Sequence, residues 1–172
     1  MALRPGKCYR DIDRPYTRIS TRKPRKSYVK GVPKPKITVF ELGTKADYRK
    51  VAYLVSERAV QIRHNALESA RVAAVQYLEK TMGKGYFFKV RVYPHHVLRE
   101  NPLATGAGAD RFQQGMRLSF GKPIGTAAQV RSGQKLVEVR FNEGSEENTK
   151  IALKKASFKL PTPCKIVVEN LA

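Results

Sequence analysis

The sequence predicts an α+β fold in which a mixed or mainly antiparallel sheet carries two helices. Short runs of β-branched and aromatic residues recur along the chain, and two amphipathic segments lie far apart among them. Residues 1–36 are rich in Lys, Arg and Pro, whereas hydrophobic patterning begins at Ile37. We therefore expect an extended basic N-terminal arm (1–36) and a single α+β domain (37–172), with a long flexible loop inserted at about 100–115.

The strands are predicted from short apolar or alternating runs. In residues 86–94 the alternation has a period of two, so that one face is apolar and the other carries Lys89 and Arg91, which face either RNA or solvent. Beyond this run the pattern lapses until MRLSFG (116–121) and GTAAQVR (125–131). The predicted strands are ITVFEL (37–42), VAYLVSE (51–57), YFFKVRVYP (86–94), KLVEVRF (135–141) and CKIVVEN (164–170).

The first helix is predicted between Asn65 and Gly83. Asn65 is a good N-cap with Glu68 three residues later, and glycine commonly follows the last helical residue. Arg63 and Arg71 lie off the apolar stripe and face a partner or solvent. The stripe has helical spacing and consists of Leu67, Ala70, Ala74, Tyr77 and Leu78.

The second helix is predicted over SEENTKIALKKA (145–156). Ser145 stands at the N-cap, acidic residues follow in the first turn, and Lys154 and Lys155 occupy the last turn. This charge distribution complements the helix dipole at both ends.

The charge balance points to a polyanionic partner. The 172 residues contain 34 Lys and Arg against 14 Asp and Glu, a formal net charge of +20. Self-repulsion on this scale is relieved by a phosphate backbone. A membrane surface is the competing polyanion, but no apolar run approaches the length that a spanning helix needs. The start of the chain lacks a secretory signal, so we expect a cytoplasmic protein.

The N-terminal arm is the most basic segment. It holds twelve Lys and Arg against two acids, Asp11 and Asp13, with five prolines and three interleaved tyrosines. One alternative is a disordered solubilising tail; the other, which the charge and aromatics favour, is an arm that becomes ordered along RNA. The expected RNA-binding residues are Arg4, Lys7, Arg10, Arg14, Arg18, Arg22, Lys23, Arg25, Lys26 and Lys30.

The stretch NPLATGAGADRFQQGM (101–116) interrupts the hydrophobic pattern and could be a phosphate-binding loop, a mobile lid or a probe inserted into a partner. The Walker A pattern of phosphate-binding loops needs four residues between its two glycines and a Ser or Thr after its lysine. Here five residues separate Gly115 from Gly121, and Pro123 stands where the hydroxyl is needed. A loop of small residues with basic flanks is compatible with a probe that enters a nucleic-acid cavity.

No catalytic or metal-binding constellation emerges. His95 and His96 with Glu100 fit no zinc-binding pattern, and Cys8 and Cys164 stand at opposite ends of the chain. We expect no cofactor, no metal and no enzymatic activity. The alternative from another class of protein is a small-molecule or metal-dependent enzyme that uses His95 or His96.

Five segments in order resemble one family. They are LRPGKCYRDIDRPYTR (3–18), ALESARVAAVQYLEK (66–80), FKVRVYPHHVLREN (88–101), GAGADRFQQGMRLSFGKPIGTAAQV (106–130) and IALKKASFKLPTPCKIVV (151–168). They resemble the archaeal and eukaryotic counterpart of bacterial ribosomal protein L-sixteen, the QM protein family. The chain ends at Ala172 without the longer tail of eukaryotic members, which favours an archaeal member.

The resemblance implies an α+β domain of the hammerhead type and a structural constituent of the large ribosomal subunit. The sequence gives no clear sign of oligomerisation, so we expect the free protein to be a monomer. The resemblance also implies binding to 23S rRNA near the A-site tRNA and the peptidyl transferase centre, in the vicinity of 5S rRNA and next to other ribosomal proteins. The long loop is expected to reach toward tRNA acceptor ends. The family is not itself catalytic, because peptide-bond formation is carried out by RNA. The runner-up is a stand-alone RNA-binding regulatory or ribosome-maturation factor.

The loop residues are carried over by position. This sequence departs from the eukaryotic pattern at ENPLAT (100–105), where Glu100 argues against a strong phosphate contact on that side of the loop. The expected residues of the tRNA-site loop are Arg99, Gly106, Gly108, Arg111, Gln114, Arg117 and Lys122.

Overall fold

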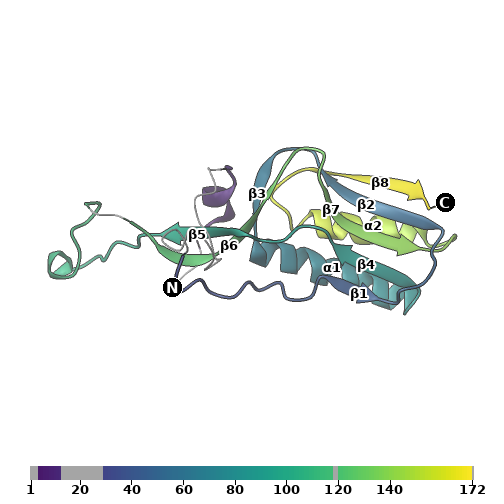
Figure 1. The fold of residues 1–172 in the computed structure, drawn as a ribbon, viewed down its shortest axis with the longest axis horizontal. Coiled ribbons are helices and arrows are strands. Elements are labelled where there is room, and N and C mark those ends of the chain that lie inside the picture. The colour runs from purple at the N-terminus through teal and green to yellow at the C-terminus, as the bar shows by residue number, and fades with distance from the viewer. Residues whose placement is uncertain (1–3, 13–28, 118–119, 172) are drawn as a thin grey trace.

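The computed structural model describes residues 4–12, 29–117 and 120–171. Two helices lie side by side along one face of a five-stranded sheet, and a three-stranded sheet continues the molecule at one end (Figure 1). A long loop projects from the three-stranded sheet, away from the helices. The predicted α+β class is therefore confirmed, and every strand pairing among the described residues is antiparallel.

The five-stranded sheet has the order β1-β4-β7-β2-β8. Its central strands come from distant parts of the sequence, since Tyr53 of β2 lies opposite both Glu138 of β7 and Val167 of β8. The strands are β1 (Glu41–Gly43), β2 (Lys50–Ser56), β4 (Tyr86–Val90), β7 (Lys135–Phe141) and β8 (Cys164–Asn170).

The three-stranded sheet has the order β3-β6-β5. It is made of β3 (Val60–Arg63), β5 (His96–Glu100) and β6 (Lys122–Val130). β5 and β6 form a hairpin whose last pair is Glu100 opposite Lys122. This pairing places the base of the long loop at the far end of the sheet.

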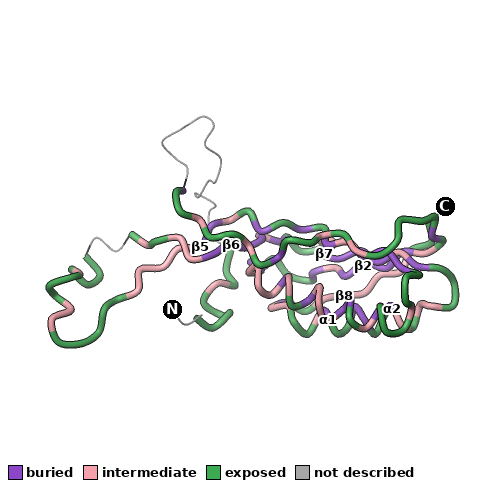
Figure 2. The backbone as a smooth tube through the Cα atoms, turned by 90° about the horizontal axis from the view of Figure 1, so that it is seen from below, coloured by how far each residue is buried: buried purple, intermediate pink, exposed green. Residues whose placement is uncertain are grey.

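The hydrophobic core lies between the helices and the five-stranded sheet (Figure 2). The predicted stripe of α1 (His64–Met82) is buried at four of its five positions, and α2 (Glu146–Ser157) buries Ala152, Leu153 and Ala156 beside it. Tyr77, the fifth stripe residue, is half-buried. The facing side chains of the sheet include Leu54, Phe88, Val139 and Phe141, all without exposed surface.

The helix boundaries correct one prediction. Asn65 is not the N-cap: the helix begins at His64, directly after β3, and Arg63 takes the cap position with an extended backbone. The Asn65 carboxamide instead accepts a hydrogen bond of 3.0 Å from the adjacent Ala66 N–H. Gly83 ends the helix as predicted, with φ of 57° and its N–H donating to the Glu79 carbonyl. Ser145 stands at the N-cap of α2, but without a side-chain capping hydrogen bond.

Two strands lie where none was predicted, β3 and β5, and the run at 37–42 gives only the short β1. Just before β1, the Phe40 carbonyl accepts a backbone hydrogen bond of 2.8 Å from the Val90 N–H of β4. The predicted resumption of strand pattern at 116 was also wrong for the described residues, since β6 begins at Lys122.

The described arm residues, 4–12 and 29–36, contain one turn of 3₁₀ helix, Gly6–Tyr9. Val29 is the buried side chain among them, whereas Ile37 at the start of the domain has no exposed surface. The division of the chain at residue 36 stays a prediction, because residues 13–28 lie outside the described part.

Candidate nucleic-acid interface

The projecting loop spans residues 101–121, somewhat longer than predicted. Its described residues hold one 3₁₀ turn, Ala109–Arg111, and the left-handed Gly108 (φ of 80°) precedes that turn. Figure 2 shows the loop as exposed and partly exposed backbone, away from the buried core. Phe112 has 86% of its surface exposed and Met116 has 69%. Large apolar side chains held this far from a core are available to a partner surface.

One glutamine side chain fixes the shape of the loop. The Gln113 carboxamide accepts a hydrogen bond of 2.6 Å from the Ala104 N–H and donates one of 2.8 Å to the Pro102 carbonyl. It thereby joins the outgoing and returning halves of the loop. The tip is therefore a shaped projection rather than a structureless connection.

The predicted loop residues occupy two places. Arg111, Gln114 and Arg117 are exposed at the tip, together with the turn-forming glycines at 106 and 108. Arg99 and Lys122 lie at the base, where the Arg99 guanidinium stacks on the exposed Phe120 ring with 4.4 Å to its centre. The structure thus separates a cationic, aromatic tip from a cationic base.

The beginning of the arm is attached to the edge strand β3. The backbone N–H of Gln61 donates to the Arg10 carbonyl (2.9 Å), and its side chain donates to the Tyr9 carbonyl (3.1 Å). Arg63 donates to the Arg4 carbonyl (3.0 Å) and lies over the Tyr9 ring at 5.2 Å. These contacts cover a strand edge that would otherwise be open to pairing.

The predicted arm residues are placed only in part. Arg4, Lys7 and Arg10 are exposed around the 3₁₀ turn, and Lys30 is exposed further along the chain. The remaining ones lie outside the described residues: Arg14, Arg18, Arg22, Lys23, Arg25 and Lys26.

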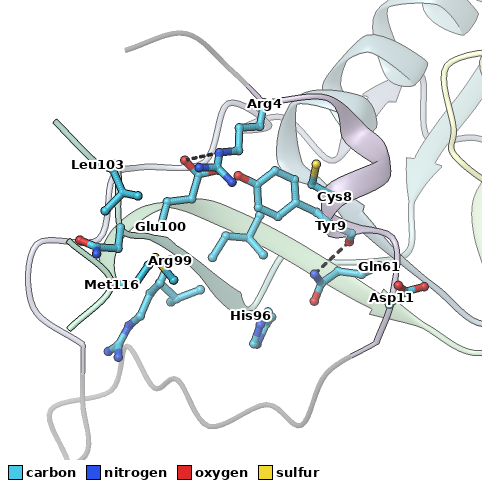
Figure 3. A pocket seen from close by; sticks show the side chains of 13 residues that line it. Arg4, Cys8, Tyr9, Asp11, Gln61, His96, Arg99, Glu100, Leu103 and Met116 are labelled. Carbon is cyan, nitrogen blue, oxygen red and sulfur yellow. Dashed lines mark hydrogen bonds and ion pairs between the residues drawn. The ribbon is translucent and has the colours of Figure 1, made fainter. Parts of the chain in front are cut away.

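Glu100 meets an arm residue rather than solvent. Its side chain is only 10% exposed, and its Oε2 lies 3.6 Å from the Arg4 Nε (Figure 3). A cavity of about 560 Å³ separates the 3₁₀ turn from β5 at this point. Glu100 is thus a nearly buried carboxylate beside an arm arginine, and its effect on a phosphate contact on this side of the loop stays a prediction.

A second basic surface, on the face of the five-stranded sheet opposite the helices, was only half anticipated. Arg91 lies over the Tyr53 ring at 5.8 Å, and the Lys135 ammonium over the same ring at 3.5 Å. Phe87 similarly lies beneath Arg140 at 5.7 Å. The alternation in 86–94 indicated Arg91, but Tyr53 joins it only through the pairing of β2 with β7.

Carboxylates hold these cations in place. The buried Glu138 accepts hydrogen bonds from Arg91 (2.9 Å) and Arg140 (2.7 Å). At the sheet edge, hydrogen bonds from Lys89 and then Lys45 lower the pKa of Glu41 to about 2. The ordered cations above aromatic rings form a surface suited to phosphates and ribose.

The helix side carries a smaller patch. Phe158 follows α2 with most of its ring exposed, and the Lys155 ammonium lies 3.9 Å from the centre of the Tyr77 ring. Lys80 and Lys159 lie in the same shallow groove between the two helices. Sequence patterning assigned Tyr77 to the core stripe and so gave no signal for this patch.

Residues considered for other chemistry are not assembled into a site. Within the described ranges, no three His, Cys, Asp or Glu side chains come together as a metal site. Cys8 is exposed, whereas burial raises the pKa of the Cys164 thiol to about 11. No helix in the described part of the chain is long and apolar enough to span a membrane.

Comparisons with known proteins show which family this chain is similar to. The family model described as ribosomal protein L16p/L10e matches residues 16–167. A large ribosomal subunit protein uL16 from Staphylothermus marinus is 52% identical over 174 residues, covering 99% of this chain and 96% of the relative. The uL16 of Methanococcus aeolicus is 49% identical, covering 98% and 95%, and that of Archaeoglobus fulgidus is 46% identical, covering 99% and 95%.

Proposed function

The chain belongs to the ribosomal protein L16p/L10e family, and on that premise we propose that it binds 23S rRNA beside the A-site tRNA, with the loop at 101–121 directed toward the peptidyl transferase centre. As a member of this family it is a structural constituent of the large ribosomal subunit and binds rRNA in translation, in the cytoplasm. It is a structural protein rather than an enzyme.

The projecting hairpin loop carries the proposal. β5 and β6 lift residues 101–121 beyond the body, where Phe112 and Met116 are exposed beside Arg111 and Arg117. A soluble domain gains nothing from presenting these apolar side chains to water, whereas a pocket of folded RNA accepts both rings and cations. The loop is therefore the part of the chain that reaches tRNA acceptor ends.

The basic surfaces anchor the body in this proposal. When a protein with a net charge of +20 binds folded RNA, its Lys and Arg displace counterions from the phosphates, which favours binding. The arm and the sheet face supply Lys and Arg on more than one side of the domain. Contacts in the vicinity of 5S rRNA and with neighbouring ribosomal proteins belong to this proposal, with the free protein a monomer.

The experiment compares footprints on the rRNA. Large subunits depleted of this protein are reconstituted with the full chain, or with a chain in which residues 103–116 are replaced by a short Gly-Ser linker. We expect hydroxyl-radical cleavage of 23S rRNA to increase at the tRNA acceptor-end site with the shortened chain, while the protections made by the body remain.

A matched variant separates loop length from loop charge. Arg111→Ala with Arg117→Ala keeps the length and Gln113, and is expected to weaken the same protections only in part. Identical footprints for the full and the shortened chain would contradict a loop that reaches the tRNA site.

A further inference from the structure

The cavity between the arm and β5 has the make-up of a binding pocket. Three segments that lie far apart in the sequence line it: the arm through Arg4 and Tyr9, β3 through Gln61, and the hairpin through Glu100. Its volume of about 560 Å³ lies within the range of roughly 300–1,000 Å³ that small-ligand pockets occupy. Figure 3 shows the Arg4, Tyr9 and Glu100 side chains converging at one end.

Two buried polar atoms at that end have unused hydrogen-bonding capacity. The Tyr9 hydroxyl and the Glu100 Oε1 are both buried and have no hydrogen-bond partner in the described parts of the chain. The other carboxylate oxygen, Oε2, is 3.6 Å from Arg4, longer than a hydrogen bond, so it also retains acceptor capacity. Buried polar groups are normally paired, and a buried carboxylate is the most costly group to leave unpaired.

We propose that this pocket holds one unstacked guanine base of the RNA, with its Watson–Crick edge on Glu100 and Tyr9. The proposal rests on the proposed function, because RNA is the partner that brings the base. Guanine is the base whose N1–H and exocyclic N2–H donors lie side by side, so that both point at the two oxygens of one carboxylate. The neighbouring O6 then accepts a hydrogen bond from the Tyr9 hydroxyl.

The rest of the lining fits the same ligand. Leu98, Leu103 and Met116 provide apolar surface for the flat face of a base. Arg4 at the mouth, with Lys7 and Arg10 exposed nearby, provides cations for the flanking phosphates. Adenine and cytosine each present a ring nitrogen acceptor beside their amino group, and that acceptor would face the carboxylate.

The test uses reconstituted large subunits and kethoxal, which modifies unpaired guanines at N1 and N2. Subunits carry the unmodified chain, Glu100→Gln or Tyr9→Phe; the last variant keeps the ring beneath Arg63 and removes only the hydroxyl. Glu147→Gln, an exposed carboxylate on α2, serves as the matched control. We expect one guanine that the unmodified chain protects to become reactive by about tenfold or more in Glu100→Gln, and less so in Tyr9→Phe.

The outcomes separate the pocket from the function on which it rests. A hydroxyl-radical backbone footprint that persists while no guanine protection depends on Glu100 overturns the pocket and leaves RNA binding intact. Glu100-dependent protection of an adenine or cytosine from dimethyl sulfate overturns the choice of guanine. Loosening of a neighbouring protein in Glu100→Gln, with base reactivity unchanged, shows that a protein side chain occupies the pocket. If the unmodified chain gives no backbone footprint on the rRNA, the proposed function itself is contradicted.

Discussion

The imidazole Nδ1 of His64 accepts a hydrogen bond from the backbone N–H of Lys36, with 2.9 Å between the two nitrogens. The bond ties the last residue of the predicted arm to the first residue of α1. It requires that Nδ1 carry no proton. Burial, and then the charges of Lys36 and Arg63, lower the pKa of His64 accordingly.

This contact predicts a pH-dependent stability. Because the pKa of His64 is lower in the folded state, the unfolded chain takes up the proton first as pH falls. The stabilising effect is therefore complete above the ordinary pKa of about 6.5 and is lost as pH falls toward the folded value, at no more than about 1.4 kcal/mol per pH unit. His64→Gln should flatten this slope, measured as the free energy of unfolding in urea between pH 7.5 and 5.

The control for that measurement is His95→Gln, because His95 is exposed. The slope should then match that of the unmodified chain. An unchanged slope in His64→Gln would instead assign the pH dependence to other groups.

Two glycines with similar backbone angles should tolerate alanine differently. Gly43 has φ of 88° and lies so close to β4 that an added Cβ would stand 2.2 Å from the Tyr86 carbonyl oxygen. Gly144 has φ of 91°, but an added Cβ would meet nothing within 4 Å. Gly144→Ala should cost about 1–2 kcal/mol from backbone strain alone, and Gly43→Ala clearly more, because β1 must separate from β4. Thermal unfolding of both variants measures the difference, and equal losses would rule out the contact with Tyr86.

Glu138 should matter more than an exposed carboxylate in a similar pair. It is 3% exposed and holds both Arg91 and Arg140, so Glu138→Ala should lower the free energy of unfolding by about 1–3 kcal/mol. Glu169 pairs with Lys135 at 3.1 Å at the surface, and Glu169→Ala should cost less than about 1 kcal/mol. Urea unfolding of the two variants provides the comparison. A similar loss in both would mean that Glu138 acts as an ordinary surface partner.

Gln113 should control the order of the loop. Gln113→Ala removes both side-chain bonds to the outgoing half of the loop, so the Ala104 N–H should exchange with deuterium faster while the core amides remain unchanged. Gln114→Ala, an exposed neighbour, is the matched control and should leave the exchange at Ala104 unaltered. Slow exchange in both variants would show that other contacts maintain the loop.

Local signals in the sequence were sufficient where an element carries its own pattern. The alternation in 135–141, the run 164–170 and the stop at Gly83 each predicted the corresponding strand or helix end. β3 and β5 were missed because their stability comes from β6, as in the pairing of Arg63 with Ala127 and of His96 with the same residue. Asn65 was assigned as a cap because sequence patterning cannot see that a strand leads directly into the helix.

For the surfaces too, the sequence indicated features within one segment but not contacts between distant segments. Composition and family resemblance indicated a basic arm and a projecting loop, whereas the meeting of Arg4, Tyr9 and Glu100 depends on where the arm lies against β3. The row of cations over Tyr53 likewise depends on the register between β2 and β7. Such clusters arise from pairing between distant segments, which hydrophobic periodicity does not encode.

The position of β2 between β7 and β8 has a consequence for how the protein is made. β2 is synthesised early, yet its hydrogen-bonding neighbours, β7 and β8, follow it by about 80 residues or more. While the residues between β2 and β8 are being translated, Val51, Leu54 and Val55 of the growing polypeptide therefore lack their partner strands. The five-stranded sheet therefore closes only after β8 has been synthesised, and the unfinished chain is prone to aggregate during that interval.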